Sequence, residues 1–167
     1  MPQHTQTPVS TSNNAFELHE LVGYRMARLS ASIGNLAEHE AMETAGLTLP
    51  EYRVLVVLDT SGPCGVTALQ NLMRIDKAWI SRSLAKLVEK SLAVSNMDAY
   101  DGRRSIYKVT SAGHAAAQAL INRALARQKT IYAGFSIEEK MQIDTLLERL
   151  QHNVDQALSC KEKPNKP

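Results

Sequence analysis

Long hydrophobic runs are missing from this sequence of 167 residues. No apolar run approaches the roughly 18 residues that a membrane-spanning helix requires. The first residues, Met-Pro-Gln-His-Thr-Gln-Thr-Pro, also lack the apolar segment of a secretory signal peptide. We therefore expect a cytoplasmic protein without membrane partners, long enough for one domain with a hydrophobic core.

Cysteine is scarce as well. Cys64 and Cys160 lie far apart and match no metal-ligand spacing, so the sequence predicts two reduced thiols, no metal site and no cofactor. Control by thiol oxidation is an alternative, because a thiolate near basic groups is reactive. Control by a metal at the acidic, histidine-containing run of residues 38–43 is another, although such a run is typical of a solvated helix face.

The motifs of common enzyme classes are absent too. The chain has no phosphate-binding loop, no glycine run for a dinucleotide and no HExxH zinc motif. Ser83 and Lys86 have the spacing of a serine–lysine pair, but no supporting motif accompanies them. The sequence therefore predicts a protein that is not an enzyme.

Positive charge is present but unevenly distributed. The net charge is +2, whereas residues 66–110 hold eight cationic and four anionic side chains, which leaves the remaining chain at −2. A basic stripe on a mildly acidic body is the electrostatic footprint of a protein that binds nucleic-acid phosphates.

The central part of the chain has the pattern of a helix-turn-helix followed by a hairpin. A capping box at residues 48–51 opens one helix. A short helix at 66–73, a tight turn and a helix at 76–90 capped by Asp76 follow. Residues 92–97 and 105–109 are strand candidates on either side of a turn-rich segment.

Long amphipathic helices flank this central part. Apolar residues recur at three- and four-residue steps between residues 16 and 44, and again in helices that begin near Thr110 and Ser136. These stripes are larger than the central lobe needs to cover itself, which predicts pairing with a second copy.

The predicted fold is mainly α with a small β-hairpin wing, a winged helix-turn-helix with long dimerisation helices at both ends. Its expected parts are a disordered tail at 1–13, a dimerisation helix at 14–46, a DNA-binding lobe at 47–110, two dimerisation helices at 111–158 and a tail at 159–167.

Residues 76–90 are expected to form the DNA-reading helix. One face is apolar and should pack on the domain through Ile80, Leu84, Leu87 and Val88. The other is small, hydroxylic and cationic, and so suits a major groove where arginine pairs with guanine. Lys77 in the first turn is placed to reach a phosphate. For Trp79 two roles stay open, contact with a thymine methyl or packing beneath the hairpin.

The hairpin tip is expected to enter the minor groove. Arg103 and Arg104 follow the turn, and a narrow minor groove attracts arginine through its enhanced negative potential. Asp101 is placed to orient the guanidinium of Arg103 through a charge-assisted hydrogen bond.

This arrangement resembles the MarR family of winged helix-turn-helix regulators across residues 18–125. The residues that carry the resemblance are Gly46-Leu-Thr48, Asp76-Lys77, Ser81-Arg82, Leu87, Leu92, Asp101-Gly-Arg103, Val109-Thr110 and Gly113.

The resemblance implies a homodimer on a palindromic operator, with dimer contacts from the first and last helices. The implied DNA contacts are Lys77, Ala78, Trp79, Ser81, Arg82, Lys86, Arg103 and Arg104. Two features depart from the family pattern. Ser91 stands where a glycine is usual, and Ser95-Asn96 replace basic residues of the first wing strand.

Many members of the family release DNA when a small aromatic, often anionic, ligand binds between the dimer helices and the lobe. Arg25 is the first candidate to hold such a ligand, because a cation in an apolar stripe requires a partner. An internal ion pair or a snorkelling stem is the alternative. His19, Tyr24 and Tyr52 are candidates by position.

We therefore expect a ligand-responsive transcriptional regulator, acting as a repressor, whose effector is an aromatic acid or its thioester. The alternatives are a winged-helix regulator controlled by thiol oxidation or metal, and a winged helix used for protein contact.

Overall fold

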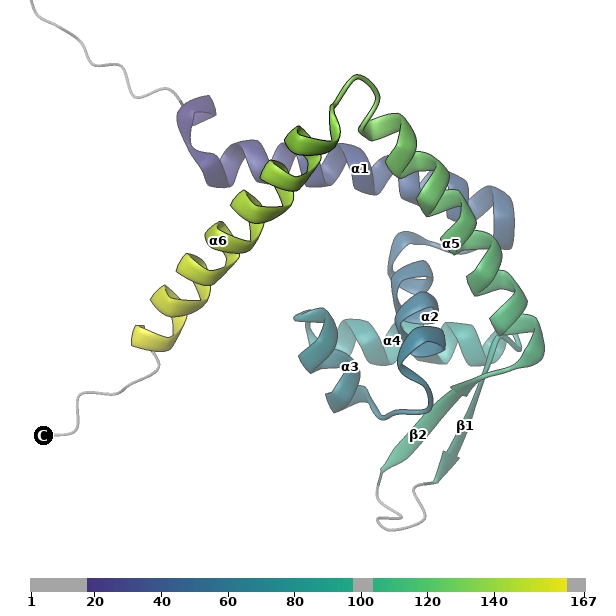
Figure 1. Ribbon diagram of the computed structural model, residues 1–167. Helices are drawn as coiled ribbons and strands as arrows, with labels where there is room; N and C mark the ends of the chain where they lie inside the picture. The colour runs from purple at the N-terminus through teal and green to yellow at the C-terminus, as the bar shows by residue number, and fades with distance from the viewer. Residues whose placement is uncertain (1–17, 98–103, 162–167) are drawn as a thin grey trace, which may run out of the picture.

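The structure is a computed structural model that describes residues 18–97 and 104–161. In chain order the elements are η1 (Leu18–Glu20), α1 (Val22–Ala45), α2 (Leu49–Ser61), α3 (Val66–Met73), α4 (Lys77–Glu89), β1 (Ala93–Met97), β2 (Ser105–Val109), α5 (Ser111–Ile131) and α6 (Ile137–Lys161). The long helices α1, α5 and α6 dominate the outline in Figure 1, and a smaller lobe lies below α1 and beside α5. This is the predicted mainly α fold with a two-stranded wing.

Side-chain caps begin α2, α4, α5 and α6, as the sequence predicts. At the start of α2, Thr48 and Glu51 form the reciprocal capping box. The Thr110 hydroxyl accepts the Gly113 N–H at 3.0 Å at the start of α5. Ser136 does the same for the Glu139 N–H at 3.1 Å before α6. Each of these bonds satisfies a donor that the helix itself leaves unpaired.

Both terminal helices differ from the predicted ranges. The first was expected from residue 16, but α1 begins at Val22 because Leu21 has extended backbone angles (φ −68°, ψ 123°) that separate it from η1. At the other end, α6 continues to Lys161 rather than stopping at residue 158. The expected tail at 1–13 and residues 162–167 lie outside the described part.

The hydrophobic core lies where α2 meets α4 and α5. Its largest fully buried side chains come from the loop before α2 and from α2, α3, α4 and α5: Leu47, Val54, Leu55, Leu58, Leu69, Ile80, Leu84, Leu87 and Leu120. The core therefore joins the helix-turn-helix to α5, so the lobe and the first of the C-terminal helices form one packed unit.

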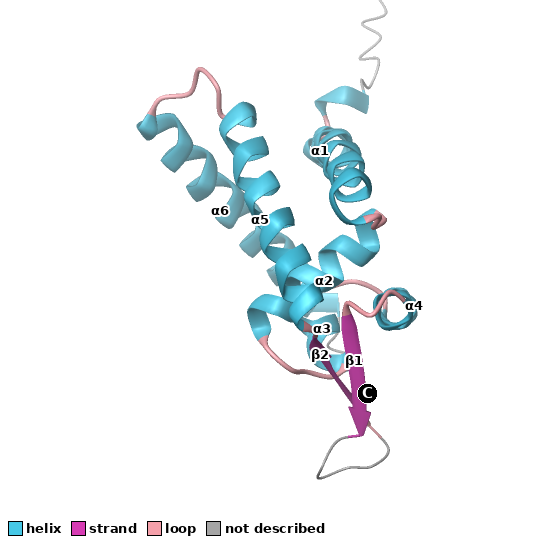
Figure 2. Ribbon diagram, turned by 90° about the vertical axis from the view of Figure 1, so that its right-hand side faces the viewer, coloured by secondary structure: helices cyan, strands magenta, loops and turns pink. Residues whose placement is uncertain are grey.

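The wing is a short antiparallel hairpin that leaves the lobe at the end opposite the α5–α6 corner (Figure 2). Ala93 pairs with Val109 at its base and Met97 with Ser105 toward its tip. The turn before α3 pairs with β2 through an isolated β-bridge, in which the backbones of Cys64 and Tyr107 exchange hydrogen bonds of 3.1 and 3.0 Å. This bridge ties the hairpin to the start of α3.

A large apolar surface remains uncovered on the long helices. Every residue from 18 to 32 is exposed, so the first half of α1 has no face buried by the part of the chain that the structure describes. Helix α6 likewise exposes Met141, Leu146 and Val154, each by more than half. None of the helices in the described ranges combines the length and low polarity needed to cross a membrane.

Candidate nucleic-acid interface

Helix α4 is held by its apolar face and its amino-terminal cap. The Asp76 carboxylate accepts the N–H groups of Ala78 at 2.9 Å and Trp79 at 3.2 Å. Ile80, Leu84 and Leu87 are fully buried, as predicted. Val88, however, is 37% exposed.

The fourth buried position of α4 belongs to Ser83 instead of Val88. Ser83 is 4% exposed, and its hydroxyl donates to the Trp79 carbonyl at 3.0 Å. That bond satisfies a polar group that would otherwise be costly to bury. A small, self-satisfied serine allows α4 to lie close to the helix beneath it.

The opposite face of α4 points to solvent with the predicted composition. The exposed side chains are Lys77, Ala78, Trp79, Ala85, Arg82 and Lys86. Ser81 is half-buried, and its hydroxyl donates to the Lys77 carbonyl at 3.0 Å within the helix. Cations flanking small residues let a helix approach base edges closely while neutralising phosphates on either side.

Trp79 lies on the side of this face that looks toward α2. It lines a shallow hollow of about 190 Å³ together with Pro50 and Arg82, across from the capped start of α2. Lys86 lines the same hollow, and its ammonium pairs with Glu89 at 2.8 Å, which raises the pKa of Lys86. Lys86 is therefore fully charged at neutral pH.

The base of the wing is fixed directly behind α4. The Thr110 N–H donates to the Leu92 carbonyl at 3.0 Å, and the Thr110 hydroxyl donates to the Ser91 carbonyl at 2.8 Å. Ser91 itself has a left-handed backbone (φ 57°). A side chain is disfavoured in this conformation and glycine is favoured, and glycine is the residue that the family resemblance leads us to expect at this position.

Of the predicted wing residues, the structure describes Arg104, which is exposed next to the start of β2. Arg103 and its predicted support Asp101 lie outside the described residues. The hairpin leaves the lobe on its side away from α1 (Figures 1 and 2). It follows α4 directly in the chain, so the helix and the wing belong to one lobe, as a major-groove helix and a minor-groove wing require.

The predicted effector residues fall into two separate groups. His19 lies in η1, and Tyr24 and Arg25 lie on the exposed first half of α1. Tyr52 on α2 instead lines a hollow of about 290 Å³ that none of the other three residues lines.

We call this cavity the α2 hollow, and it also contains a cation that the sequence interpretation missed. Its lining residues are Tyr52, Arg53, Val56, Val57, Met73 and Ile75. Arg53 is half-buried beside Tyr52. The signal in the sequence was the same one that singled out Arg25, a cation on a largely apolar helix.

The cysteines and the acidic run offer little to the alternative control mechanisms. Burial raises the pKa of the Cys64 thiol, which disfavours the reactive thiolate. Cys160 is exposed on α6. In the described ranges no three His, Cys, Asp or Glu side chains gather as a metal site would need, and His39 pairs with Glu43 at 3.3 Å.

A model of the MarR family matches residues 47–104, from just before α2 into the hairpin. The chain belongs to the MarR family. This MarR protein is accordingly a DNA-binding transcriptional regulator and not an enzyme, as the sequence predicts.

Similar proteins cover most of the MarR chain. It is 29% identical over 131 residues to the uncharacterized HTH-type transcriptional regulator YxaD of Bacillus subtilis (strain 168), across 78% of this chain and 91% of that protein. The structure of the MarR/EmrR family regulator from Acinetobacter sp. ADP1 is 25% identical with a TM-score of 0.76, and the match covers 84% of this chain and 99% of that one. Bordetella bronchiseptica BpsR, whose DNA binding is regulated by 6-hydroxynicotinic acid, is 20% identical and shares the fold (TM-score 0.73, across 81% and 96%).

Proposed function

We propose that this MarR regulator is a homodimeric repressor that binds a palindromic operator and releases it when a small aromatic anion binds. The observation that carries the proposal is the combination of an exposed, cationic α4 face with long helices whose apolar residues stay uncovered by residues 18–97 and 104–161. One surface suits DNA, and the other suits a second copy.

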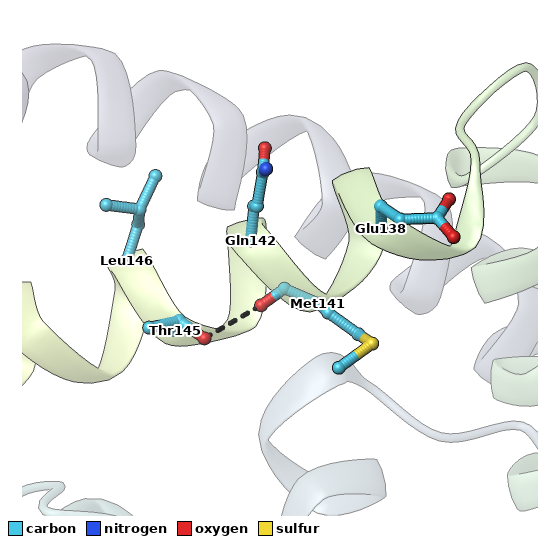
Figure 3. Close-up of a pocket in the computed structure, with 5 residues that line it drawn as sticks. All are labelled: Glu138, Met141, Gln142, Thr145 and Leu146. Atoms are coloured by element: carbon cyan, nitrogen blue, oxygen red, sulfur yellow. Dashed lines mark hydrogen bonds between the residues drawn. The ribbon is translucent and has the colours of Figure 1, made fainter.

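Helix α6 supplies the strongest support for dimerisation. A hollow of about 510 Å³ is lined by Glu138, Met141, Gln142, Thr145 and Leu146, all from this one helix (Figure 3). Gln142 and Leu146 project from one side of α6 and Met141 from the other. An exposed apolar surface of this kind, lined by a single helix, is typical of a protein–protein interface.

The exposed η1 and first half of α1 supply a matching surface. Leu18, Val22 and Leu29 are each more than half exposed. A closed two-fold dimer in which α1, α5 and α6 of two copies pack together would bury both surfaces at once. It would also present two copies of α4 in the arrangement that a palindromic operator requires.

The DNA contacts follow from the same dimer. Lys77 and Lys86 bind phosphates, while Ala78, Trp79, Ser81 and Arg82 face the base edges. Arg103 and Arg104 enter the adjacent minor groove, and Asp101 orients Arg103. Trp79 contacts a thymine methyl group, since it lies exposed on the α4 face beside Arg82.

The effector binds in the α2 hollow. Tyr52 offers an aromatic surface and Arg53 a cation for a carboxylate, which suits an aromatic acid or its thioester. The structurally similar BpsR responds to 6-hydroxynicotinic acid, a ligand of this class. In the dimer, Arg25, Tyr24 and His19 of the second copy close the hollow.

The first experiment is fluorescence anisotropy with DNA from the intergenic region upstream of the gene, against scrambled DNA, at two salt concentrations. We expect saturable, selective binding by one dimer. Arg82→Ala should weaken binding by about 1–3 kcal/mol, and Arg103→Ala with Arg104→Ala should lower the salt slope by about two. Lys129→Ala on α5 is the matched control and should change neither. Equal, weak binding to both DNAs would favour the protein-contact alternative.

The effector is tested by adding 6-hydroxynicotinate, other aromatic carboxylates and their uncharged amides to the preformed complex. We expect release by acids and not by amides. Arg53→Gln and Arg25→Gln should each shift the release to higher acid concentration, while Arg149→Gln on α6 should not. Release by amides at the same concentration as acids would contradict an anionic effector.

A further inference from the structure

An ion pair joins the helix-turn-helix to α6 across 81 residues of sequence. Arg74 Nη1 lies 2.5 Å from Asp155 Oδ1, and Arg74 Nη2 lies 3.2 Å from Asp155 Oδ2. Two parallel hydrogen bonds of this kind fix direction as well as distance. Gln151, one turn earlier on α6, donates to the same carboxylate at 2.9 Å and so orients it.

Arg74 lies in the turn between α3 and α4, so fixing its side chain restrains the start of the DNA-reading helix α4. It ends α3 in a left-handed conformation (φ 53°), and its N–H donates to the Gln70 carbonyl at 2.8 Å. Two residues later, Asp76 caps α4. Among the described residues Arg74 and Ser91 are the non-glycine positions with positive φ, and they stand at the two ends of α4.

The same turn also borders the α2 hollow. Met73 and Ile75, the neighbours of Arg74 in the chain, both line that cavity. A molecule seated beside Tyr52 would therefore touch the segment that the ion pair holds. Three features meet within residues 73–76: the cap of α4, the wall of the hollow and the contact with α6.

We propose that the Arg74–Asp155 pair is a strut that fixes the orientation of α4 relative to α6, making Arg74 a positioning residue for DNA binding. The proposal rests on the proposed function, in which α6 belongs to the dimer interface. Because α6 is then fixed by the second copy, the strut sets the angle between α4 and the dimer axis. An effector in the α2 hollow acts on this same turn.

The Arg74–Asp155 pair is expected to affect the orientation of α4 more than the stability of the fold. Both side chains are partly exposed, at 64% for Arg74 and 35% for Asp155, and exposed pairs add little to folding stability. The hydrogen bond from Arg74 lowers the pKa of Asp155, so the pair persists at neutral pH. Removing it should therefore leave the fold intact while freeing the angle between α4 and α6.

The first test compares operators whose half-site spacing is normal or changed by one base pair. Wild-type protein should prefer the normal spacing. Asp155→Asn should weaken binding to it by about fivefold or more and reduce the preference, because a freed lobe tolerates the wrong spacing. The reversed pair, Arg74→Asp with Asp155→Arg, should restore both. Glu43→Gln breaks the exposed His39–Glu43 pair on α1 and serves as the matched control.

A second readout needs no DNA. Trp79 is the single tryptophan of the chain and lies on α4, whereas Cys160 is exposed on α6. With Cys64→Ser as background, an energy-transfer acceptor on Cys160 reports the distance between α4 and α6. We expect a narrow distance distribution in the parent protein and a broad one in Asp155→Asn, with circular dichroism unchanged.

The outcomes are distinct. Loss of binding in Arg74→Gln but not in Asp155→Asn would mean that Arg74 contacts DNA directly, which overturns the strut. An unchanged distance distribution in Asp155→Asn would overturn it as well. If no DNA is bound selectively and yet the distribution broadens, the strut stands and the proposed operator binding is wrong.

Discussion

Replacing Lys90 with methionine tests how the DNA-reading helix is joined to the rest of the lobe. The Lys90 ammonium donates to the Glu51 carboxylate at 2.8 Å and to the Gly46 carbonyl at 2.7 Å. Gly46 ends α1 and Glu51 lies in the first turn of α2. One cation just after α4 therefore links three helices.

The cost of the substitution comes from Glu51, which is 7% exposed. Without Lys90 its carboxylate keeps the hydrogen bond from the Thr48 N–H at 3.0 Å but loses its counter-charge. Breaking a fully buried pair costs about 3–5 kcal/mol. Because the Lys90 side chain is 35% exposed and water reaches the pair, we expect about 2 kcal/mol at neutral pH.

The pH dependence gives this prediction its signature. Burial raises the pKa of Glu51, but the hydrogen bonds from Lys90 and Thr48 outweigh it and hold the pKa below its ordinary value. In the wild type this carboxylate therefore stabilises the fold above its unfolded-state pKa, and the contribution is lost as the pH falls through the folded-state pKa. Lys90→Met removes two of the contributions that lower this pKa and leaves burial as the largest, so we expect the folded-state pKa to rise above the unfolded one.

The variant should then gain stability from Glu51 protonation as the pH falls through its raised folded-state pKa, so its deficit relative to wild type should already be smaller at pH 4.5 than at pH 7. Urea unfolding followed by circular dichroism, from pH 4 to 7.5 at fixed protein concentration, measures this. Glu51→Gln is the control, because its amide does not titrate and still accepts from Lys90. A Lys90→Met deficit equal at pH 4.5 and pH 7 would refute the electrostatic account.

Three further predictions concern the hairpin and the thiols. Gly113→Ala should destabilise the lobe by about 2 kcal/mol or more, because the added methyl group would lie 1.9 Å from the Leu92 carbonyl oxygen. Thermal unfolding measures this loss of stability, and a loss under about 0.5 kcal/mol would contradict the prediction. Ser91→Gly should raise stability by about 1 kcal/mol by relieving its left-handed backbone, whereas an unchanged melting temperature would argue against strain there. Iodoacetamide at pH 7 should modify Cys160 well before Cys64, whose thiol pKa is raised; faster reaction of Cys64 would revive control by thiol oxidation.

The sequence predicted the elements of the lobe because their signals are local. Capping at Thr48, Asp76 and Thr110 depends on side chains within three residues of the backbone they satisfy, and each cap is confirmed. The two faces of α4 likewise follow from helical spacing, with Val88 as the exception. Val88 is 37% exposed, and Ser83 takes the buried position in its place.

The tertiary structure decided which distant residues meet. Arg74 and Asp155 are 81 residues apart, and Lys90 lies 39 residues from Glu51, so no periodicity links either pair. The same holds for the α2 hollow, where Arg53 of α2 faces Met73 and Ile75 of the helix-turn-helix. Local capping and periodicity fix what each segment becomes, whereas the packing of α2 against its neighbours fixes which charges come within hydrogen-bonding distance.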